Sequence, residues 1–289
     1  MPFTLSHVVA ILPARRWLPP SALAVGAVVP DVPYYLPLPF SSASTHAWWG
    51  APLLGLPAGV LLLVLFHQVL RAPLTGLAPA GLRARLPEAV RPAPVAVVAG
   101  LLAGMATHLL WDAFTQVGGP AVMHWEALRQ PVAGAHRVFN VLMYVSSAGG
   151  LLILAGWLVR WYRRTPARPV PPPDLAGHSH GEVPPDFAGR GAVSPGLAGR
   201  VRGLVLAAAT LATAAGAAVG LASDRAAVSD YDLVRSTILG GADGAAAALA
   251  CYVLAWHAWT AFSRRPSRWR GEQEGRRRTG SAGPNRPAP

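Results

Sequence analysis

The chain alternates between long apolar stretches and shorter polar ones. Five of the apolar stretches reach the ~20 residues that a helix needs to cross the ~30 Å hydrocarbon core of a membrane. They are Gly50–Leu70, Pro94–Phe114, Val138–Val159, Val201–Leu221 and Leu233–Phe262. The pattern therefore predicts an all-α fold, a polytopic bundle of transmembrane helices.

The N-terminal region follows a less regular pattern. The stretch Ser21–Phe40 is apolar but is broken by Asp31 and several prolines, which cannot continue a helix. We expect a short N-terminal helical insertion here, so that the bundle has about five or six spans. Residues 1–14 are too short to span, and two alternatives remain for them. They lie on the cytoplasmic face, or they enter from outside as the first arm of a hairpin.

Composition supports the membrane assignment. Hydrophobic residues make up 52% of the chain and charged residues 13%, whereas soluble domains carry about 25% charged residues. So few charges cannot cover a globular surface in water, and we expect the lipid bilayer to be the main partner. The single cysteine, Cys251, excludes a disulfide framework.

The net charge of +12 reflects the topology of the chain. Arginines gather in the loop 71–93, after residue 159 and after residue 262, whereas the alternate loops 41–49, 115–137 and 222–232 hold few. Because cytoplasmic loops collect basic residues, we predict a multi-pass protein of the bacterial inner membrane with its C-terminus in the cytoplasm. Because the topology accounts for the basic charge, no nucleic-acid partner is expected.

Two further features concern the N-terminal region and the segments that join or follow the spans. Arg15-Arg16 beside an apolar run also fits a twin-arginine signal, although the run precedes the pair and no clear A-x-A cleavage site follows. Proline and glycine are frequent in 165–200. We expect a membrane domain over 1–164, a disordered cytoplasmic linker over 165–200, a transmembrane hairpin over 201–262 and a disordered basic tail over 263–289.

Five polar residues of the first half stand in apolar surroundings. They are His7, Asp31, His46, His108 and Asp112. A charged group inside a span costs about 2.5–3.5 kcal/mol on insertion scales, so it usually faces the bundle interior and has a partner. His108 and Asp112 are four residues apart and so share one helical face. His108 lies about 21 Å along its helix from Pro94, toward the outer leaflet.

The other three polar residues fit the same depth. His46 lies in the outer loop ahead of the first long span, and Asp31 lies on an outward-running segment. His7 reaches them only when residues 1–14 form a hairpin arm inserted from outside, so we prefer that alternative. We therefore expect all five to gather near the outer leaflet.

Imidazole and carboxylate groups in this combination are typical metal ligands. Without a cation, three histidines and two aspartates in a low-dielectric site would repel one another. We predict that a zinc or manganese ion is held by His7, Asp31, His46, His108 and Asp112. An open position on the ion would hold a water of lowered pKa that attacks an ester. The alternative is that His108 and Asp112 only hydrogen-bond each other within the bundle.

Other polar residues are weaker candidates. His124, Glu126 and His136 belong to the outer loop 115–137 and are expected to have a plain loop role, with a ligand or proton-shuttle role as the alternative. His67 and His257 are expected at the membrane interface. Asp243 lies inside the last span, where a partner such as Arg235 or a hydroxyl would balance it.

Several of these motifs together resemble the DUF4184 family of bacterial membrane proteins. They are Met-Pro-Phe-Thr-Leu-Ser-His7, Val29-Pro-Asp31-Val-Pro-Tyr-Tyr35, Ser44-Thr-His46, Leu65-Phe-His67, Thr107-His-Leu-Leu-Trp-Asp-Ala-Phe-Thr115, His124-Trp125 and Tyr144-Val-Ser-Ser-Ala-Gly-Gly150. The resemblance covers about 1–160 and extends more loosely over the second half. The family has no established activity.

A more distant resemblance suggests a reaction. The order His, Pro-Asp, Thr-His, His-x-x-x-Asp is similar to that of the YdjM-like (DUF457) membrane-bound metal-dependent hydrolases, which in turn look like the zinc-dependent phospholipase C and nuclease group. This resemblance implies the same five ligands and makes Asp31 a candidate bridge between two ions. The chain departs from the pattern at Gln116, where a histidine is expected. No second H-x-x-x-E pair lies within the apolar segments of the sequence.

These inferences lead to a functional expectation with one alternative. The leading hypothesis is a metal-dependent hydrolase of phosphoesters, including lipid head groups, in which Asp31 is catalytic and orients the attacking water. The alternative is a non-enzymatic structural or transport-related bundle that holds no metal.

Overall fold

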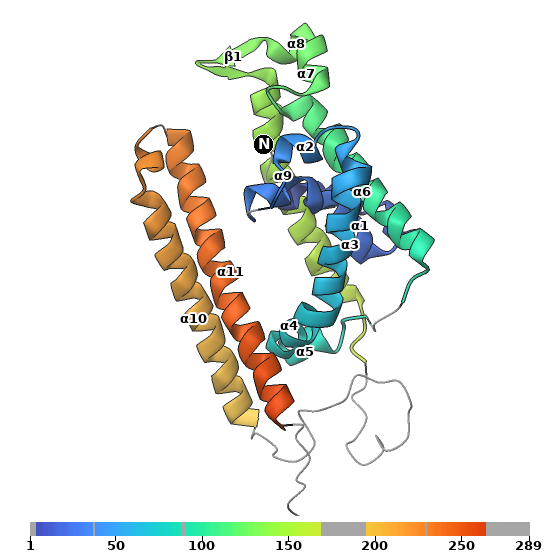
Figure 1. Ribbon diagram of the computed structural model, residues 1–289, viewed down its shortest axis with the longest axis vertical. Helices are drawn as coiled ribbons and strands as arrows, with labels where there is room; N and C mark the ends of the chain where they lie inside the picture. Colours follow the sequence, from blue (N-terminus) through green and yellow to red (C-terminus); the bar gives the residue numbers. More distant parts are fainter. Residues whose placement is uncertain (1–3, 37, 88–90, 169–194, 229, 264–289) are drawn as a thin grey trace, which may run out of the picture.

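The structure, a computed structural model, describes residues 4–36, 38–87, 91–168, 195–228 and 230–263. Nearly all ordered elements in these ranges are helices (Figure 1), which confirms the predicted all-α bundle. Five helical stretches of this part of the chain are long and apolar enough to cross a membrane. They are Ala51–Leu77, Pro94–His124, Val138–Arg164, Gly199–Leu221 and Asp232–Phe262. The five predicted spans are thus present, as in a multi-pass membrane protein.

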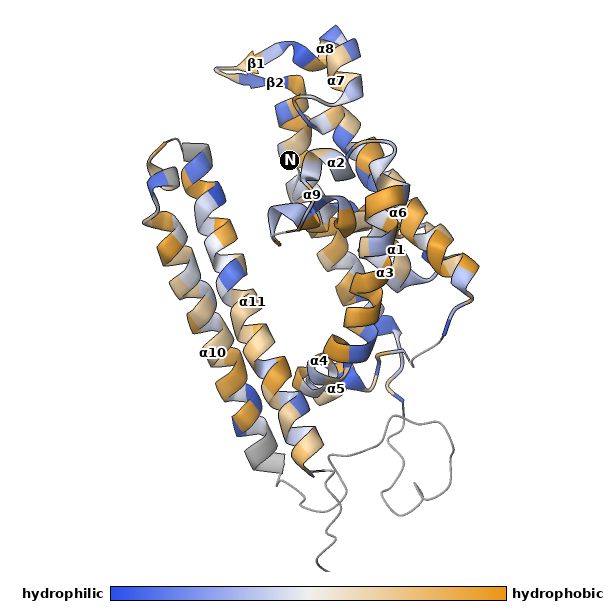
Figure 2. Ribbon diagram, viewed as in Figure 1, coloured by the Kyte–Doolittle hydropathy of each residue, from blue (hydrophilic) through white to orange (hydrophobic). Residues whose placement is uncertain are grey.

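The spans differ in regularity. The first joins four helical pieces end to end, with two wide π-helical segments among them; these are η4 (Ala51–Gly55), α3 (Leu56–Val64), η5 (Leu65–Leu70) and α4 (Arg71–Leu77). The short α5 (Ala80–Arg83) follows. The next two spans are the α-helices α6 (Pro94–Thr115) and α9 (Val138–Arg164). Hydrophobic residues dominate the long helices, and hydrophilic residues gather toward their ends (Figure 2).

The N-terminal region is built from short helices. They are η1 (Thr4–Ile11), η2 (Ala14–Arg16), α1 (Pro20–Val28) and η3 (Val29–Tyr34). Pro30 and Pro33 lie within η3, where they cannot supply the amide hydrogens of an α-helix. The irregular insertion predicted for this region is therefore present as α1 and η3.

The first residues of the chain are inserted among the other helices. The η1 helix packs against α1, α6 and α9. A Cβ at Gly150, in the middle of α9, would meet Ser6 of η1. Further along, the Arg15 side chain of η2 lies over the ring of Trp157 in α9. Residues 4–16 are therefore inserted among the other helices and contact α9.

The closest packing in the N-terminal half joins α1 to α6. A Cβ at Gly104 would collide with backbone atoms of Leu23 and Ala27. Leu101 and Met105 flank this contact and are fully buried. Small residues that let backbones touch are typical of helix pairs in membranes. This contact fixes the start of η3 against the second half of α6.

A small cap closes one end of α6 and α9, where the sequence predicted only a loop (Figure 1). It contains α7 (Pro120–His124), α8 (Glu126–Arg129) and a two-stranded ribbon of β1 (Pro131–Ala133) and β2 (His136–Arg137). The ribbon turns at Gly134, which has a φ of 53°. Such short elements carry too little periodicity to be predicted from the sequence.

The C-terminal helices form a separate hairpin. It consists of α10 (Pro195–Leu221), η7 (Asp224–Ala227) and α11 (Asp230–Ser263). The α10 helix begins six residues before the predicted start at Val201. Tyr252 donates a hydrogen bond to the carbonyl oxygen of Pro73 at 3.0 Å, which joins α11 to α4. Most of the predicted linker, at 169–194, and the tail at 264–289 lie outside the described residues.

Candidate metal centre

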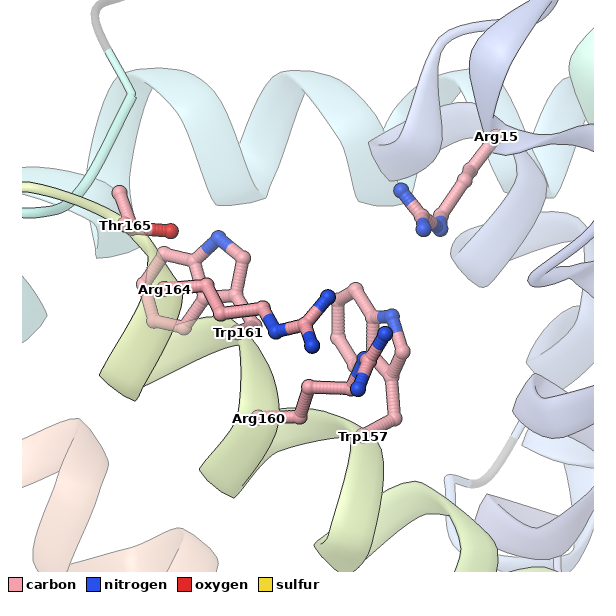
Figure 3. Close-up of a pocket in the computed structure, with 6 residues that line it drawn as sticks. All are labelled: Arg15, Trp157, Arg160, Trp161, Arg164 and Thr165. Carbon is pink, nitrogen blue, oxygen red and sulfur yellow. The ribbon is translucent and has the colours of Figure 1, made fainter.

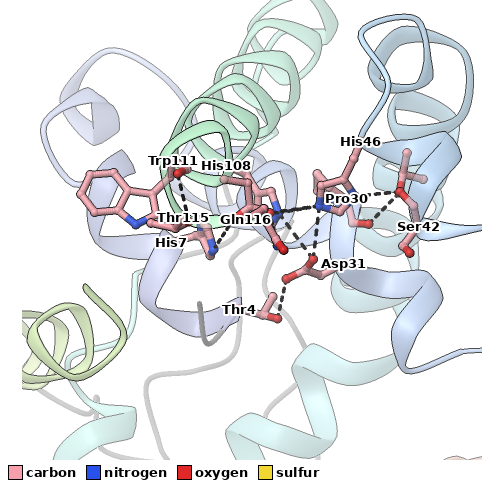
Figure 4. Close-up of polar contacts among 12 residues, drawn as sticks. Thr4, His7, Pro30, Asp31, Ser42, His46, His108, Trp111, Thr115 and Gln116 are labelled. Atoms are coloured by element: carbon pink, nitrogen blue, oxygen red, sulfur yellow. Dashed lines mark hydrogen bonds and ion pairs between the residues drawn. The ribbon is translucent and has the colours of Figure 1, made fainter. Parts of the chain in front are cut away.

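Four of the five predicted ligands meet at one point between η3, α2 (Ser42–Thr45) and α6 (Figure 4). Asp31, His46, His108 and Asp112 each offer one ligand atom, and these atoms all lie within 4.8 Å of one another. Asp31 and His108 are fully buried, and Asp112 is 4% exposed. Residues separated by up to 81 positions in the chain thus form one polar cluster inside an apolar bundle.

His108 is oriented by a backbone contact. Its Nδ1 donates a hydrogen bond to the carbonyl oxygen of Ala27 at 2.8 Å. Ala27 belongs to the last turn of α1, whose carbonyls lack partners within their own helix. Since Nδ1 carries the hydrogen, Nε2 of the neutral ring has a free lone pair, and this atom faces the cluster. Outer hydrogen bonds of this kind fix the tautomer of metal-binding histidines.

His46 is held in the same way from the opposite side. Ser41 caps α2 by accepting a hydrogen bond from the backbone N–H of Ser44, and Thr45 donates to the carbonyl oxygen of Pro30 at 2.7 Å. The Nδ1 of His46, just after α2, donates to the carbonyl oxygen of Ser42 at 2.8 Å. The Nε2 atom of His46 therefore also carries a free lone pair, which points into the cluster.

Each carboxylate is positioned through one oxygen. Thr4 donates a hydrogen bond to Oδ2 of Asp31 at 2.6 Å, which turns Oδ1 toward the histidines. Gln116 donates from Nε2 to Oδ2 of Asp112 at 3.0 Å. Gln116 thus occupies the place where the family pattern led us to expect a histidine, and it holds a carboxylate of the cluster.

Five of the six distances between the four ligand atoms are nearly equal, and the sixth, between the two carboxylate oxygens, is within 4.8 Å. The Nε2 atoms of His46 and His108 are 3.3 Å apart. Oδ2 of Asp112 lies 3.2 Å and 3.3 Å from these nitrogens, and Oδ1 of Asp31 lies 3.6 Å and 3.5 Å from them. Ligands about 2.0–2.1 Å from a tetrahedral ion are about 3.3–3.4 Å apart. The five separations are therefore in the range expected for ligands that share one ion.

His7 lies directly beside these four residues. Its ring stacks on that of His108, with 4.1 Å between the ring centroids. Its Nε2 is 3.6 Å from Oδ1 of Asp112, the oxygen that does not face the other two histidines. The N-terminal insertion therefore brings the fifth predicted residue into contact with the site, on its far side from His46.

The polar atoms of the site are not satisfied by the protein alone. Both ring nitrogens of His7, Oδ1 of Asp31 and Oδ1 of Asp112 are buried without a hydrogen-bond partner among the described residues. Buried polar groups normally have such partners. A single proton between the Nε2 atoms of His46 and His108 would satisfy one pair only. A divalent cation would match all four converging atoms and offset the two carboxylate charges.

The site is most accessible at His46. The side chain of His46 is 20% exposed, against 0% for His108 and 5% for Asp112. The ring of Tyr34 lies edge-on to His46, with 6.4 Å between centroids, and Tyr34 is itself 37% exposed. A ligand would therefore approach along the side formed by η3 and α2.

The remaining candidate residues lie elsewhere. His124, Glu126 and His136 belong to the cap, and His136 packs against Tyr144 at 5.6 Å between ring centroids. His67 lies 3.3 Å from the hydroxyl of Ser21. His257 contacts the carbonyl oxygen of Val69 at 3.0 Å. Asp243 is exposed on α11. None of them belongs to the four-residue cluster of the described chain.

Sequence reasoning missed the residues that orient the ligands. Thr4 lies three positions before His7, and a threonine in an apolar segment carries no distinctive signal. Gln116 lies four positions after Asp112, so helical spacing alone places it within reach. The carbonyl oxygens of Ala27 and Ser42 are backbone groups and leave no trace in the sequence.

Comparison with known proteins identifies the family but no activity. The family model described as "Domain of unknown function (DUF4184)" matches residues 1–254. Searches of curated proteins and of solved structures found no match. The matched range includes all five residues of the site and nearly all of the α10–α11 hairpin. The chain therefore belongs to the DUF4184 family.

Proposed function

We propose that this protein is a metal-dependent hydrolase of phosphoesters, embedded in the membrane. One observation carries the proposal: two imidazole nitrogens and two carboxylate oxygens converge with five of their separations between 3.2 and 3.6 Å. Hydrogen bonding within the protein leaves two of these residues with unpartnered oxygens. Mixed nitrogen and oxygen ligands favour zinc or manganese.

The two carboxylates are suited to different tasks. Oδ2 of Asp31 accepts from Thr4, so only Oδ1 of Asp31 is free for the centre. Asp112 directs Oδ2 toward the histidines and leaves Oδ1 opposite His7. Oδ1 of Asp112 lies outside the four converging atoms and can accept the proton of an attacking water. Oδ1 of Asp31, which was predicted for that role, belongs to the converging set. A bridge between two ions is easier for Asp112, because both of its oxygens face imidazole nitrogens.

A cation at this point would supply Lewis acidity, which polarises a phosphoryl oxygen and acidifies water. The residues of the chain supply the oriented ligands, a proton acceptor and the exclusion of bulk water. His46 and His108 present lone pairs fixed by backbone carbonyls, and His7 lies within 3.6 Å of the carboxylate oxygen that can receive a proton. The buried surroundings of Asp31, His108 and Asp112 exclude bulk water, which strengthens each electrostatic interaction.

The depth of the site favours a lipid substrate. His108 and Asp112 belong to a candidate membrane span, and the most exposed ligand, His46, lies beside the exposed rings of Tyr34 and Tyr35. A phosphoester carried by a lipid is already at the membrane when it reaches His46 and the exposed ring of Tyr34 beside it, whereas a soluble ester must leave water. We extend the proposal to the bacterial inner membrane, with the site toward the outer leaflet and the C-terminus in the cytoplasm, because of the arginine distribution.

The test uses purified full-length protein in detergent. We expect elemental analysis to find about one zinc or manganese per chain, with two only if Asp112 bridges. We expect release of diacylglycerol from phospholipid micelles, or of nitrophenol from bis(nitrophenyl) phosphate. Chelation should abolish this release, and addition of the metal should restore it. His108→Ala should lose both metal and activity, while His67→Ala, which changes an exposed histidine of another span, should retain both.

The outcomes separate the two hypotheses. A wild-type protein that is folded but holds no zinc or manganese supports the non-enzymatic bundle and rejects the proposal. Hydrolysis that survives in His108→Ala would point to a contaminating enzyme. Stoichiometric metal without hydrolysis of either substrate would retain the centre and reject the phosphoesterase.

A further inference from the structure

A second polar site lies between η2 and the last turns of α9. It is a pocket of about 310 Å³ lined by Arg15, Trp157, Arg160, Trp161, Arg164 and Thr165. The guanidinium groups of the three arginines point into the same space, between the two tryptophan rings and η2 (Figure 3). Arg15 lies over the ring of Trp157, with its Cζ 5.3 Å from the ring centroid. Arg15 also lines a neighbouring pocket of about 280 Å³.

These three positive charges have no acidic partner among the described residues. No carboxylate of the described residues forms an ion pair with Arg15, Arg160 or Arg164, because every ion pair there joins a histidine to an aspartate of the metal centre. Guanidinium groups that converge repel one another, and an anion among them removes that cost. The planar guanidinium matches the oxygens of a phosphate group in particular.

We expect the pocket to lie at the level of the lipid phosphates. Arg160 and Arg164 follow directly after the apolar part of a candidate span, and tryptophans at such positions are typical of the membrane interface. On the face of α9 that lines the pocket, one turn before Trp157, the apolar side chain of Ile153 is 57% exposed. A phosphate that enters the pocket can thus keep its acyl chains against the helix. A free phosphate would gain nothing from this apolar surface.

We propose that this pocket binds the phosphate group of an anionic phospholipid at the cytoplasmic leaflet. The guanidinium groups of Arg15, Arg160 and Arg164 contact the phosphate, and the rings of Trp157 and Trp161 border the glycerol region. The binding joins η2 to α9 and so braces the segment that carries His7. The proposal is independent of the hydrolase function, because none of these residues belongs to the metal centre.

The test measures lipids retained by the intact protein. Full-length protein in detergent is mixed with equal amounts of phosphatidylglycerol and phosphatidylcholine, and bound lipid is counted by native mass spectrometry. We expect wild type to retain the anionic lipid about tenfold better, a preference that corresponds to about 1.4 kcal/mol. We expect a variant with Arg15→Gln, Arg160→Gln and Arg164→Gln to lose this preference. Arg160→Gln alone should reduce it, which keeps the test valid if the triple variant fails to fold.

A control with the same change of charge separates the pocket from general attraction. It combines Arg163→Gln with Arg200→Gln and Arg202→Gln, which lie outside the pocket at the ends of α9 and α10. This control should keep the wild-type preference. Three results overturn the proposal: equal retention of both lipids by wild type, an equal loss in the control, or displacement of the lipid by millimolar inorganic phosphate. The last result would assign the pocket to free phosphate.

Discussion

The α1–α6 pair and the α10–α11 pair are both held together by glycines that bring two backbones into contact. In the first, Gly104 approaches Leu23 and Ala27, and in the second Gly216 approaches Gly240. Beyond the glycine contact, Asp31 lies on η3, which continues directly from α1, and His108 lies on α6. The α10–α11 pair has no residue in the metal-type cluster of the described chain.

The difference shows that close packing of two helices through glycines does not by itself bring polar residues together into a site. Along α10, hydroxyl groups such as that of Thr213 bond to carbonyls of their own helix, and Asp243 of α11 is exposed. In the N-terminal half, Thr4 instead bonds across elements to Asp31. The hairpin offers an aspartate, a glycine, a histidine and a threonine that can be compared with residues of the same type in or beside the centre.

The largest difference in metal affinity is expected between substitutions of two aspartates, Asp112 and Asp243. Asp112→Ala removes the carboxylate that faces three imidazoles. It should lower metal affinity by more than the ~10–100-fold typical of outer residues. Asp243→Ala removes an exposed carboxylate and should leave the affinity unchanged. Competition with a chromogenic chelator measures both, and equal metal loss in the two variants would contradict the assignment of the centre.

The second effect concerns the glycines. Gly104→Val forces a side chain into the backbone of α1, at a cost of about 1–3 kcal/mol or more for overpacking. It should also separate Asp31 from His108 and so reduce the bound metal. Gly240→Val should destabilise the hairpin by a similar amount but leave the metal content of the folded fraction intact. Thermal unfolding followed by metal analysis tests this, and metal loss in Gly240→Val would mean that the hairpin supports the centre.

These contrasts also explain what the sequence could predict. The spans were predicted because lipid requires long apolar helices, and apolar residues make up most of a span such as Pro94–Thr115. Asp31, His108 and Asp112 were found because polar groups in apolar segments are rare. The convergence with His46 and His7 depends on the 3₁₀ helices and the proline breaks, whose exact path no periodicity encodes. Thr4 and the cap were missed because short elements and single hydroxyls give no pattern.

The third effect compares two histidines. His7 lies 3.6 Å from Oδ1 of Asp112 and stacks on His108, but its nitrogens lie outside the set of four converging atoms. We expect His7→Ala to lower metal affinity by about 10–100-fold, as for residues that orient ligands. His257→Ala, which removes a contact to Val69, should leave affinity unchanged. A loss as large as that of Asp112→Ala would make His7 a direct ligand.

The smallest difference in metal affinity is expected between substitutions of two threonines, Thr4 and Thr213. Thr4→Val keeps the shape of the side chain but removes the hydroxyl that donates to Oδ2 of Asp31 at 2.6 Å. One net hydrogen bond is worth about 1–1.5 kcal/mol, so metal affinity should fall by about fivefold to tenfold. Thr213→Val removes a bond to the carbonyl of Ala209 in its own helix and should not change affinity. Since both substitutions are isosteric, an affinity of Thr4→Val equal to wild type would mean that packing alone orients Asp31. The Thr4 hydroxyl would then have no role in positioning Asp31. The two helix pairs would differ only in whether they carry metal-ligand residues.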